Sequence, residues 1–184
     1  GGKRMSTWGI LGCGTIANEM AETFQKMGRK IYGVSNRTLE KAEKFAEKYQ
    51  VEHVYAAYED MLQDDKIDVI YIATPHSMHY DNMMKAVAAG KHVLCEKAIT
   101  VNAGQLREVM ELAREKGVVV REAMTISHMP LYKALKEKIA EGAIGKVKMI
   151  QVNFGSNKGY DSTNRFFALE AAGGALLDIG VYAT

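Results

Sequence analysis

Cysteine and proline are scarce in this chain, and neither sign of charge dominates it. With only 2 cysteines, Cys13 and Cys95, the 184-residue sequence has no disulfide framework, and we expect free thiols in a reducing compartment. The 24 basic and 22 acidic residues give a net charge of +2 without a basic run. This balance argues against nucleic acid and anionic membranes as partners.

Long hydrophobic runs are absent as well. The longest apolar stretches, residues 69–73 and 118–120, fall far short of the roughly 20 residues that a membrane-spanning helix needs. The first residues contain no apolar segment of the kind that a secretory signal requires. We therefore expect a cytoplasmic protein, and no metal site is predicted.

The chain does contain a glycine turn near its start. The apolar run Trp8–Leu11 leads into Gly12, Gly14 and Ala17 with the spacing G-x-G-x-x-A, and a helical pattern follows. This order is typical of a dinucleotide-binding βαβ unit. Glycine pairs also occur by chance in loops, so the weight of the motif comes from its context. The helical face after it is predicted to comprise Ile16, Met20, Phe24 and Met27.

Each small residue of the turn has a physical purpose in this interpretation. Gly12 lets the chain turn, and Gly14 leaves room for a pyrophosphate close to the backbone. The N–H groups from Thr15 and Ile16 onward have no partners within the helix, so they would bind that anion.

The residues after the second predicted strand indicate which dinucleotide binds. Residues 30–35 form this strand, and Asn36 and Arg37 follow where NAD-preferring folds place Asp or Glu. No carboxylate repels a 2′-phosphate there, while Arg37 offers a permanent charge and Ser35 a hydroxyl. This favours NADP over NAD and argues against an S-adenosylmethionine methyltransferase. The alternative is that Arg37 is a solvated charge at a helix start.

Strands and helices then alternate to about residue 124. Further strands are predicted at 53–57, 68–73, 92–95 and 118–123, and helices at 58–63, 79–89 and 101–116, with another helix capped by Thr38. The alternation predicts an α/β fold, a Rossmann-type doubly wound parallel sheet over residues 5–124. Ligands of such sheets bind at the carboxyl ends of the strands.

Residues 125–184 follow a different pattern. A helix is predicted at 131–141, a half-buried strand at 146–154, an irregular polar segment at 155–164 and the first turns of a helix at 173–184. One strand and a short helix cannot form a sheet domain. We therefore expect the beginning of an incomplete α+β second domain.

Three residues could perform chemistry. Lys97 follows the fifth strand, at the edge that faces the cofactor crevice, where its ammonium could polarise a hydroxyl or carbonyl. Asp178 and Tyr182 are four residues apart and would share one helix face. Tyr182 could transfer a proton with the help of an ammonium such as that of Lys97. A surface lysine and a structural Asp–Tyr pair are the alternatives.

Taken together, these motifs resemble the Gfo/Idh/MocA oxidoreductases. The resemblance rests on residues 12–17, 35–37, 73–79, 90–97 and 173–182. Tyr182 stands where many members have His, as in the branch that contains dimeric trans-dihydrodiol dehydrogenases and D-xylose NADP dehydrogenases. The resemblance implies a catalytic pair of Lys97 and Tyr182, with Asp178 supporting Tyr182 or binding substrate. It implies a substrate contact from Arg165. The resemblance also implies that the nicotinamide side of the site is lined by Thr74, His76, His79 and Glu96.

The implied reaction is hydride transfer between NADP(H) and a carbinol carbon of a sugar-like or polyol substrate, in a homo-oligomer. Residues 124–130 lack the aromatic side chains of the dihydrodiol enzymes, which favours a sugar or polyol over a flat aromatic diol. Ala98 replaces the proline of the family, so a trans Lys97–Ala98 bond is expected. Two alternatives stay open, a non-catalytic NADP(H)-binding regulatory module and an inactive fragment of a longer enzyme.

Overall fold

The computed structural model describes residues 5–155, 157, 159–161 and 163–182. The chain folds as two compact units that divide between Glu122 and Ala123. Each unit is described by itself.

The first unit is built on a parallel sheet. Its strands are β1 (Trp8–Leu11), β2 (Gly33–Ser35), β3 (His53–Tyr55), β4 (Val69–Ile72), β5 (His92–Cys95) and β6 (Val120–Glu122). The six strands lie in the order β3-β2-β1-β4-β5-β6, and every neighbouring pair is parallel. The strand order reverses between β1 and β4, which is the switch point where open α/β sheets bind their ligands. The predicted Rossmann-type sheet is confirmed.

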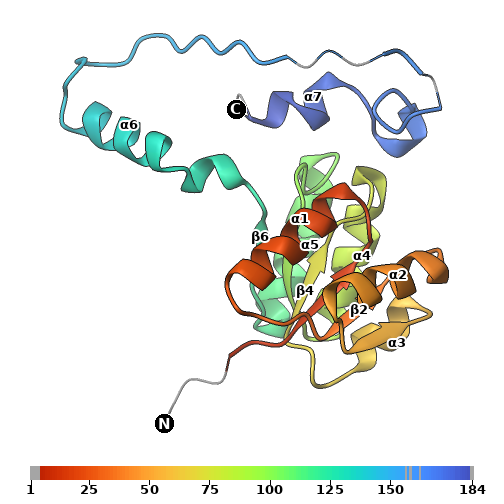
Figure 1. Cartoon of the computed structure of the whole chain (residues 1–184). Helices are drawn as coiled ribbons and strands as arrows, with labels where there is room; N and C mark the ends of the chain where they lie inside the picture. The colour runs from red at the N-terminus through yellow and green to blue at the C-terminus, as the bar shows by residue number, and fades with distance from the viewer. Residues whose placement is uncertain (1–4, 156, 158, 162, 183–184) are drawn as a thin grey trace. The chain divides into compact units, whose positions relative to one another are not determined.

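Five helices accompany these strands in the first unit (Figure 1). They are α1 (Thr15–Lys26), α2 (Leu39–Tyr49), α3 (Tyr58–Gln63), α4 (His79–Ala88) and α5 (Ala103–Lys116), with a short 3-10 turn, η1 (His76–Met78), before α4. Helix α1 contacts α2, while α4 contacts α3 and α5. A large apolar cluster joins the central strands to α3, α4 and α5; it includes Leu11, Met61, Ile72, Met83, Val87 and Val109.

The buried face of α1 differs from the predicted one. Ala17, Ala21 and Phe24 are buried, whereas Ile16 is 38% exposed and Met27 is 62% exposed. The prediction for this helix assumed that its large apolar side chains would be the buried ones. The small side chains face the interior because they let the helix backbone lie close to the sheet.

The turn into α2 is also closed differently from the prediction. Thr38 occupies the N-cap position of α2, but its side chain makes no capping hydrogen bond. The carboxamide of Asn36 donates instead to the Thr38 carbonyl at 3.0 Å. This bond orders the residues before α2, but it does not satisfy the N–H groups of the first helical turn as the expected cap would.

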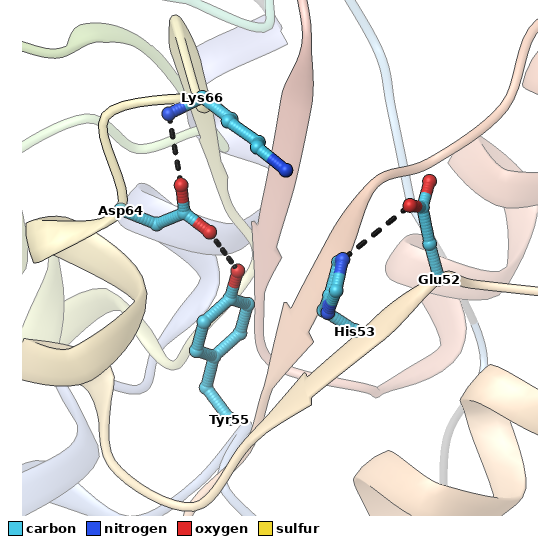
Figure 2. Close-up of polar contacts among 5 residues, drawn as sticks. All are labelled: Glu52, His53, Tyr55, Asp64 and Lys66. Carbon is cyan, nitrogen blue, oxygen red and sulfur yellow. Dashed lines mark hydrogen bonds and ion pairs between the residues drawn. The ribbon is translucent and has the colours of Figure 1, made fainter.

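The edge strand β3 is tied to the segment after α3 by one carboxylate (Figure 2). The Tyr55 hydroxyl donates to Asp64 Oδ2 at 2.6 Å, and the Lys66 main-chain N–H donates to Asp64 Oδ1 at 2.8 Å. On the same strand, His53 Nε2 lies 3.4 Å from a carboxylate oxygen of Glu52. The two bonds to Asp64 tie the short β3, at the edge of the sheet, to the segment after α3.

The same segment is anchored to β5 by a buried lysine. Lys91 is only 6% exposed, and its ammonium donates to the carbonyls of Asp64 at 2.7 Å and Ile67 at 2.9 Å. Buried main-chain carbonyls need such donors, because an unpaired one costs free energy. Lys91 therefore has a structural role.

The second unit contains short helices. They are η2 (Thr125–His128), α6 (Pro130–Ala140), η3 (Leu169–Ala171), α7 (Ala175–Asp178) and η4 (Gly180–Tyr182). Helix α6 confirms the helix predicted at 131–141.

The strand predicted at 146–154 does not form, and this prediction was wrong. Its residues have no regular secondary structure, and Met149 and Ile150 are 83% and 76% exposed. Alternating apolar residues form a strand only when a neighbouring strand supplies the hydrogen bonds. No strand is found among the described residues of this unit.

The single helix predicted at 173–184 is interrupted. Helix α7 ends at Asp178, Ile179 leaves helical geometry with φ −122° and ψ −29°, and η4 begins at Gly180. Asp178 and Tyr182 therefore do not share one face of a continuous α-helix. Residues 183–184 of this prediction lie outside the described residues.

Over the described part of the chain, no helix has both the length and the apolar character needed to cross a membrane. Within those same residues, no three His, Cys, Asp or Glu side chains are grouped so that they could hold a metal ion.

Candidate functional site

The first glycine of the turn lies between the ends of two strands. Gly12 has φ +97°, and a Cβ at this position would be 2.7 Å from the carbonyl oxygen of Ala73. Its own N–H donates to the Ser35 carbonyl at 2.9 Å. The turn therefore brings the carboxyl ends of β1, β2 and β4 together at the switch point.

The second glycine of the turn is different, because the fold does not require it. Gly14 has φ −77° and ψ −171°, which any residue can adopt, and a Cβ there would have no atom within 4 Å. Thr15 and Ile16, which follow it in the first turn of α1, are exposed. No acidic residue lies in that turn. An open space at a helix N-terminus with unpaired N–H groups suits an anion.

Asn36 connects this turn with the end of β2. Its carboxamide oxygen accepts a hydrogen bond from the Cys13 N–H at 3.2 Å. Asn18 of α1 supports the turn from the other side by donating to the Gly14 carbonyl at 2.9 Å. The glycine turn is thus held in shape by two carboxamide side chains.

Ser35 and Arg37 are placed unequally. Ser35 is fully buried, and its hydroxyl donates to the Tyr55 carbonyl at 3.0 Å, so that it is occupied within the sheet. Arg37 is exposed, and its main chain forms a hydrogen bond with the hydroxyl of the half-buried Tyr58. Burial raises the pKa of Tyr58, against the opposing effect of Arg37. Of the predicted pair, only Arg37 has a side chain available to a ligand.

The residues after β4 form a buried polar network. His79 is fully buried, and its ring nitrogens Nδ1 and Nε2 lie 2.8 Å and 2.9 Å from the carbonyl oxygens of Ala98 and Thr74. Asn82 donates to the Thr74 hydroxyl at 3.2 Å, and the His76 ring packs edge-on against His79 with centroids 5.6 Å apart. Burial lowers the pKa of His79, while the two carbonyls oppose this effect.

This arrangement gives His79 a structural position that the sequence did not reveal. Both of its ring nitrogens are engaged by the main chain, so the side chain ties the loop after β4 to the loop after β5. The contact with nicotinamide that the resemblance implied stays a prediction for Thr74, His76 and Glu96, and the geometry does not favour it for His79.

Lys97 is partly buried and follows Glu96 at the end of β5. The Glu96 N–H donates to the Ile72 carbonyl at 2.9 Å, which continues the parallel ladder beyond β5. One carboxylate oxygen of Glu96 accepts from the Tyr71 hydroxyl at 2.5 Å, and the other accepts from the Lys97 N–H at 3.3 Å. Tyr71 was predicted only as one apolar residue of a buried strand, so its hydroxyl was missed.

The Lys97–Ala98 peptide bond is cis, whereas a trans bond was expected. The expectation considered only the local preference of a bond that precedes alanine. In the fold, Ala98 is buried with its carbonyl at His79, and the Ile99 N–H donates to Glu122 Oε2 at 2.8 Å. Tertiary contacts on both sides therefore determine the path of this segment.

The two cysteines are free, as predicted. Burial raises the pKa of the Cys13 thiol to about 11 and raises that of Cys95 as well. Both are therefore thiols at neutral pH, which argues against nucleophilic cysteine chemistry.

The remaining predicted residues belong to the second unit. Arg165 is exposed, with its guanidinium 4.2 Å from the centre of the Phe166 ring. Asp178 ends α7, and the Tyr182 ring packs edge-on against Phe154 with centroids 5.8 Å apart. The catalytic and substrate roles of these residues stay predictions.

The parallel sheet with its switch point and the glycine turn before α1 define a Rossmann-type α/β protein. The chain matches the model of an oxidoreductase family with an NAD-binding Rossmann fold over residues 6–124, and the model of a GFO/IDH/MocA C-terminal domain over residues 132–184. The chain belongs to the Gfo/Idh/MocA oxidoreductase family.

The chain is similar in sequence to several dehydrogenases. The chain is 36% identical over 178 residues to trans-1,2-dihydrobenzene-1,2-diol dehydrogenase of Mus musculus and 35% identical to the human protein of that name. In both cases the match covers 95% of this chain and 53% of the relative. The chain therefore spans about half the length of the curated relatives that it matches.

Solved structures show the same architecture. One is KijD10, a 3-ketoreductase from Actinomadura kijaniata in complex with NADP and TDP-benzene, with a TM-score of 0.84 and 26% identity. The match covers 97% of this chain and 55% of that one. An NAD-binding protein from Listeria innocua has a TM-score of 0.86 and 25% identity, with 98% and 53% covered.

Proposed function

We propose that the protein, in its full-length form, is an NADP(H)-dependent oxidoreductase that acts on a carbinol carbon of a sugar-like or polyol substrate. Residues 5–124 would bind the dinucleotide, and residues 125–184 would begin the substrate domain. The observation that carries the proposal is the geometry of Gly14. The fold has no need of a glycine there, but an anion seated on the N-terminus of α1 needs the space that a Cβ would fill.

The preference for NADP rests on the end of β2. No carboxylate lies at residues 35–37, and the exposed Arg37 offers a planar cation that suits a 2′-phosphate. Ser35 is not part of this proposal, because its hydroxyl is bonded within the sheet. The NADP complex of KijD10 supports this preference by similarity.

The bound cofactor supplies the hydride acceptor or donor, and the chain supplies positioning and proton transfer. Lys97 would hold the substrate oxygen at the edge of the sheet. Tyr182 would exchange the hydroxyl proton, and Asp178, four residues earlier in the sequence, would support it or bind substrate. Arg165 would contact the substrate.

Two relatives guide the choice of substrate. One name describes the dehydrogenation of a cyclic diol, and the other describes the reduction of a keto group. Both reactions take place at a carbon that bears oxygen. Residues 124–130 offer no Phe, Tyr or Trp on which a flat ring could stack, which favours a saturated sugar or polyol. We further propose a cytoplasmic homo-oligomer.

A titration tests the cofactor assignment. NADPH and NADH are titrated by fluorescence against the chain and its Arg37→Gln variant, with Arg114→Gln at the far end of α5 as a matched control. NADPH should bind at least about tenfold more tightly than NADH, and only Arg37→Gln should remove the difference. Equal binding of the two cofactors by the unaltered chain would exclude the NADP preference.

Turnover is then tested on the full-length protein with a panel of sugars and polyols. Oxidation of a member of the panel would support the enzyme. Binding of NADPH without oxidation or reduction of any substrate would favour the regulatory module instead.

A further inference from the structure

The central strand β4 carries one hydroxyl in an otherwise apolar stretch. Tyr71 is 1% exposed, pairs in register with Ile10 of β1 and Leu94 of β5, and is flanked by the fully buried Ile70 and Ile72. A phenylalanine would fill the same space without needing a polar partner. A buried hydroxyl without a hydrogen bond costs free energy, so its partner is the informative feature.

That partner is the carboxylate of Glu96. The hydroxyl of Tyr71 donates to Glu96 Oε1 at 2.5 Å. Because Leu94 lies opposite Tyr71, Glu96, which is two residues later and directly follows β5, lies on the same face of the sheet. The bond therefore joins the end of β5 to β4 and fixes the Glu96 carboxylate close to the carboxyl edge of the sheet.

The charged and titratable groups around Glu96 act in opposite directions. Burial and the nearby Glu19 of α1 raise the pKa of the Glu96 carboxyl, while the Tyr71 hydroxyl, the Lys97 N–H and the charge of Lys97 lower it. The thiol of Cys95 on β5 also interacts with Glu96, and burial keeps that thiol neutral. Tyr71 thus favours the ionised form of a carboxyl group that its surroundings disfavour.

The position of Glu96 along the dinucleotide follows from the sheet. A pyrophosphate on the glycine turn after β1, with the adenosine half beside Arg37 after β2, leaves the nicotinamide half on the opposite side of the switch point. That side is the edge formed by the ends of β4 and β5. The oxidised nicotinamide ring carries a positive charge, and the reduced ring is neutral.

We propose that Tyr71 is a positioning residue that fixes the Glu96 carboxylate at the nicotinamide side of the site, and that this pair selects the oxidised over the reduced cofactor. The inference rests on the proposed function and adds to it a preference between the two redox forms. A carboxylate held near the ring attracts the oxidised form and has little effect on the reduced one.

Calorimetric titration with NADP⁺ and with NADPH tests this inference. The chain is compared with Tyr71→Phe, Glu96→Gln and a matched control, Tyr80→Phe, whose hydroxyl also donates to a glutamate, Glu108, but between α4 and α5. Tyr71→Phe should lower the affinity for NADP⁺ relative to NADPH by about three- to tenfold, Glu96→Gln by at least as much, and Tyr80→Phe not at all.

The pH dependence separates this role from a packing defect. In Tyr71→Phe the pH dependence of the preference for the oxidised form should shift to higher pH, because the Tyr71 hydroxyl lowers the pKa of Glu96, whereas Glu96→Gln should show no such pH dependence. An unchanged ratio in folded Tyr71→Phe, or in Glu96→Gln, would overturn the inference. If the unaltered chain bound neither form, the proposed function itself would fail, which is a distinct result. Glu96→Gln keeps the test valid if Tyr71→Phe is poorly folded.

Discussion

Gly12 and Ala73 approach so closely that a Cβ on the glycine would lie 2.7 Å from the alanine carbonyl oxygen. Gly12 also has φ +97°, where an L-residue is strained. We predict that Gly12→Ala lowers the free energy of unfolding by about 2 kcal/mol or more, measured by urea denaturation. An unchanged urea midpoint would show that the ends of β1 and β4 can separate at little cost.

Gly14→Ala provides the contrasting prediction. Its backbone is ordinary and a Cβ meets nothing within 4 Å, so the free energy of unfolding should fall by no more than about 1 kcal/mol, the size of an N-cap effect. The NADPH affinity measured by fluorescence should nevertheless fall by at least about tenfold, because the methyl group would occupy the space of the pyrophosphate. Undiminished binding would place the cofactor elsewhere and would contradict the proposed function.

Lys97→Met separates binding from chemistry. The substitution keeps most of the side-chain volume and removes the ammonium that would assist proton transfer. In the full-length protein we predict a fall in kcat of about 100-fold or more, with the NADPH affinity within about threefold of the original value. Turnover at the original rate would remove Lys97 from the mechanism.

Lys91 and Lys85 form a matched pair of lysines with different surroundings. The Lys91 ammonium is buried against two carbonyls, whereas Lys85 forms an exposed ion pair with Glu59 at 2.7 Å. Lys91→Met should destabilise the first unit by about 2–4 kcal/mol, since it leaves the Asp64 and Ile67 carbonyls without this donor. Lys85→Met should cost less than about 1 kcal/mol. Thermal or urea unfolding of both variants checks the contrast.

The pair of Tyr55 and Asp64 predicts how stability depends on acid (Figure 2). The Tyr55 hydroxyl and the Lys66 N–H hold the pKa of Asp64 below its ordinary value near 3.8. A carboxyl group whose pKa is depressed in the folded state stabilises the fold above its ordinary pKa, and this stabilisation is lost as the pH falls below that value.

Tyr55→Phe should reduce the loss of folding stability that occurs at acid pH. The variant should be less stable than the original chain at pH 7, and the difference should narrow as the pH is lowered below about 4, because Asp64 is then protonated in both. Urea midpoints measured at pH 7 and near pH 3 check this. A difference that stays constant with pH would mean that Tyr55 contributes by packing alone.

Local patterns were sufficient to predict the order of strands and helices in the first unit. The apolar runs that became β1 and β4 and the glycine turn between β1 and α1 are encoded by neighbouring residues, so their positions could be derived from the sequence. The alternation of strands and helices then predicted the parallel sheet.

Features that depend on distant partners could not be derived in this way. The hydroxyls of Ser35 and Tyr71 and the ring of His79 are bonded to groups that lie far away in sequence. The alternating residues 146–154 illustrate the converse case, because a strand pattern forms no strand unless a neighbour pairs with it.

The hydrogen bond from Ser35 to Tyr55 divides adjacent positions of the chain between two tasks. Position 35 belongs to the architecture of the sheet, whereas the side chain of Arg37, two residues later, projects from the surface. Under the proposed function, dinucleotide choice would therefore change through substitution of Arg37 alone, with Asn36 kept for its bond to Cys13 and Thr38 kept as the N-cap residue of α2. Such substitutions would leave the bonds from Ser35 to Tyr55 and from Cys13 to Asn36 in place, so the end of β2 would stay joined to the glycine turn while the exposed side chain varied.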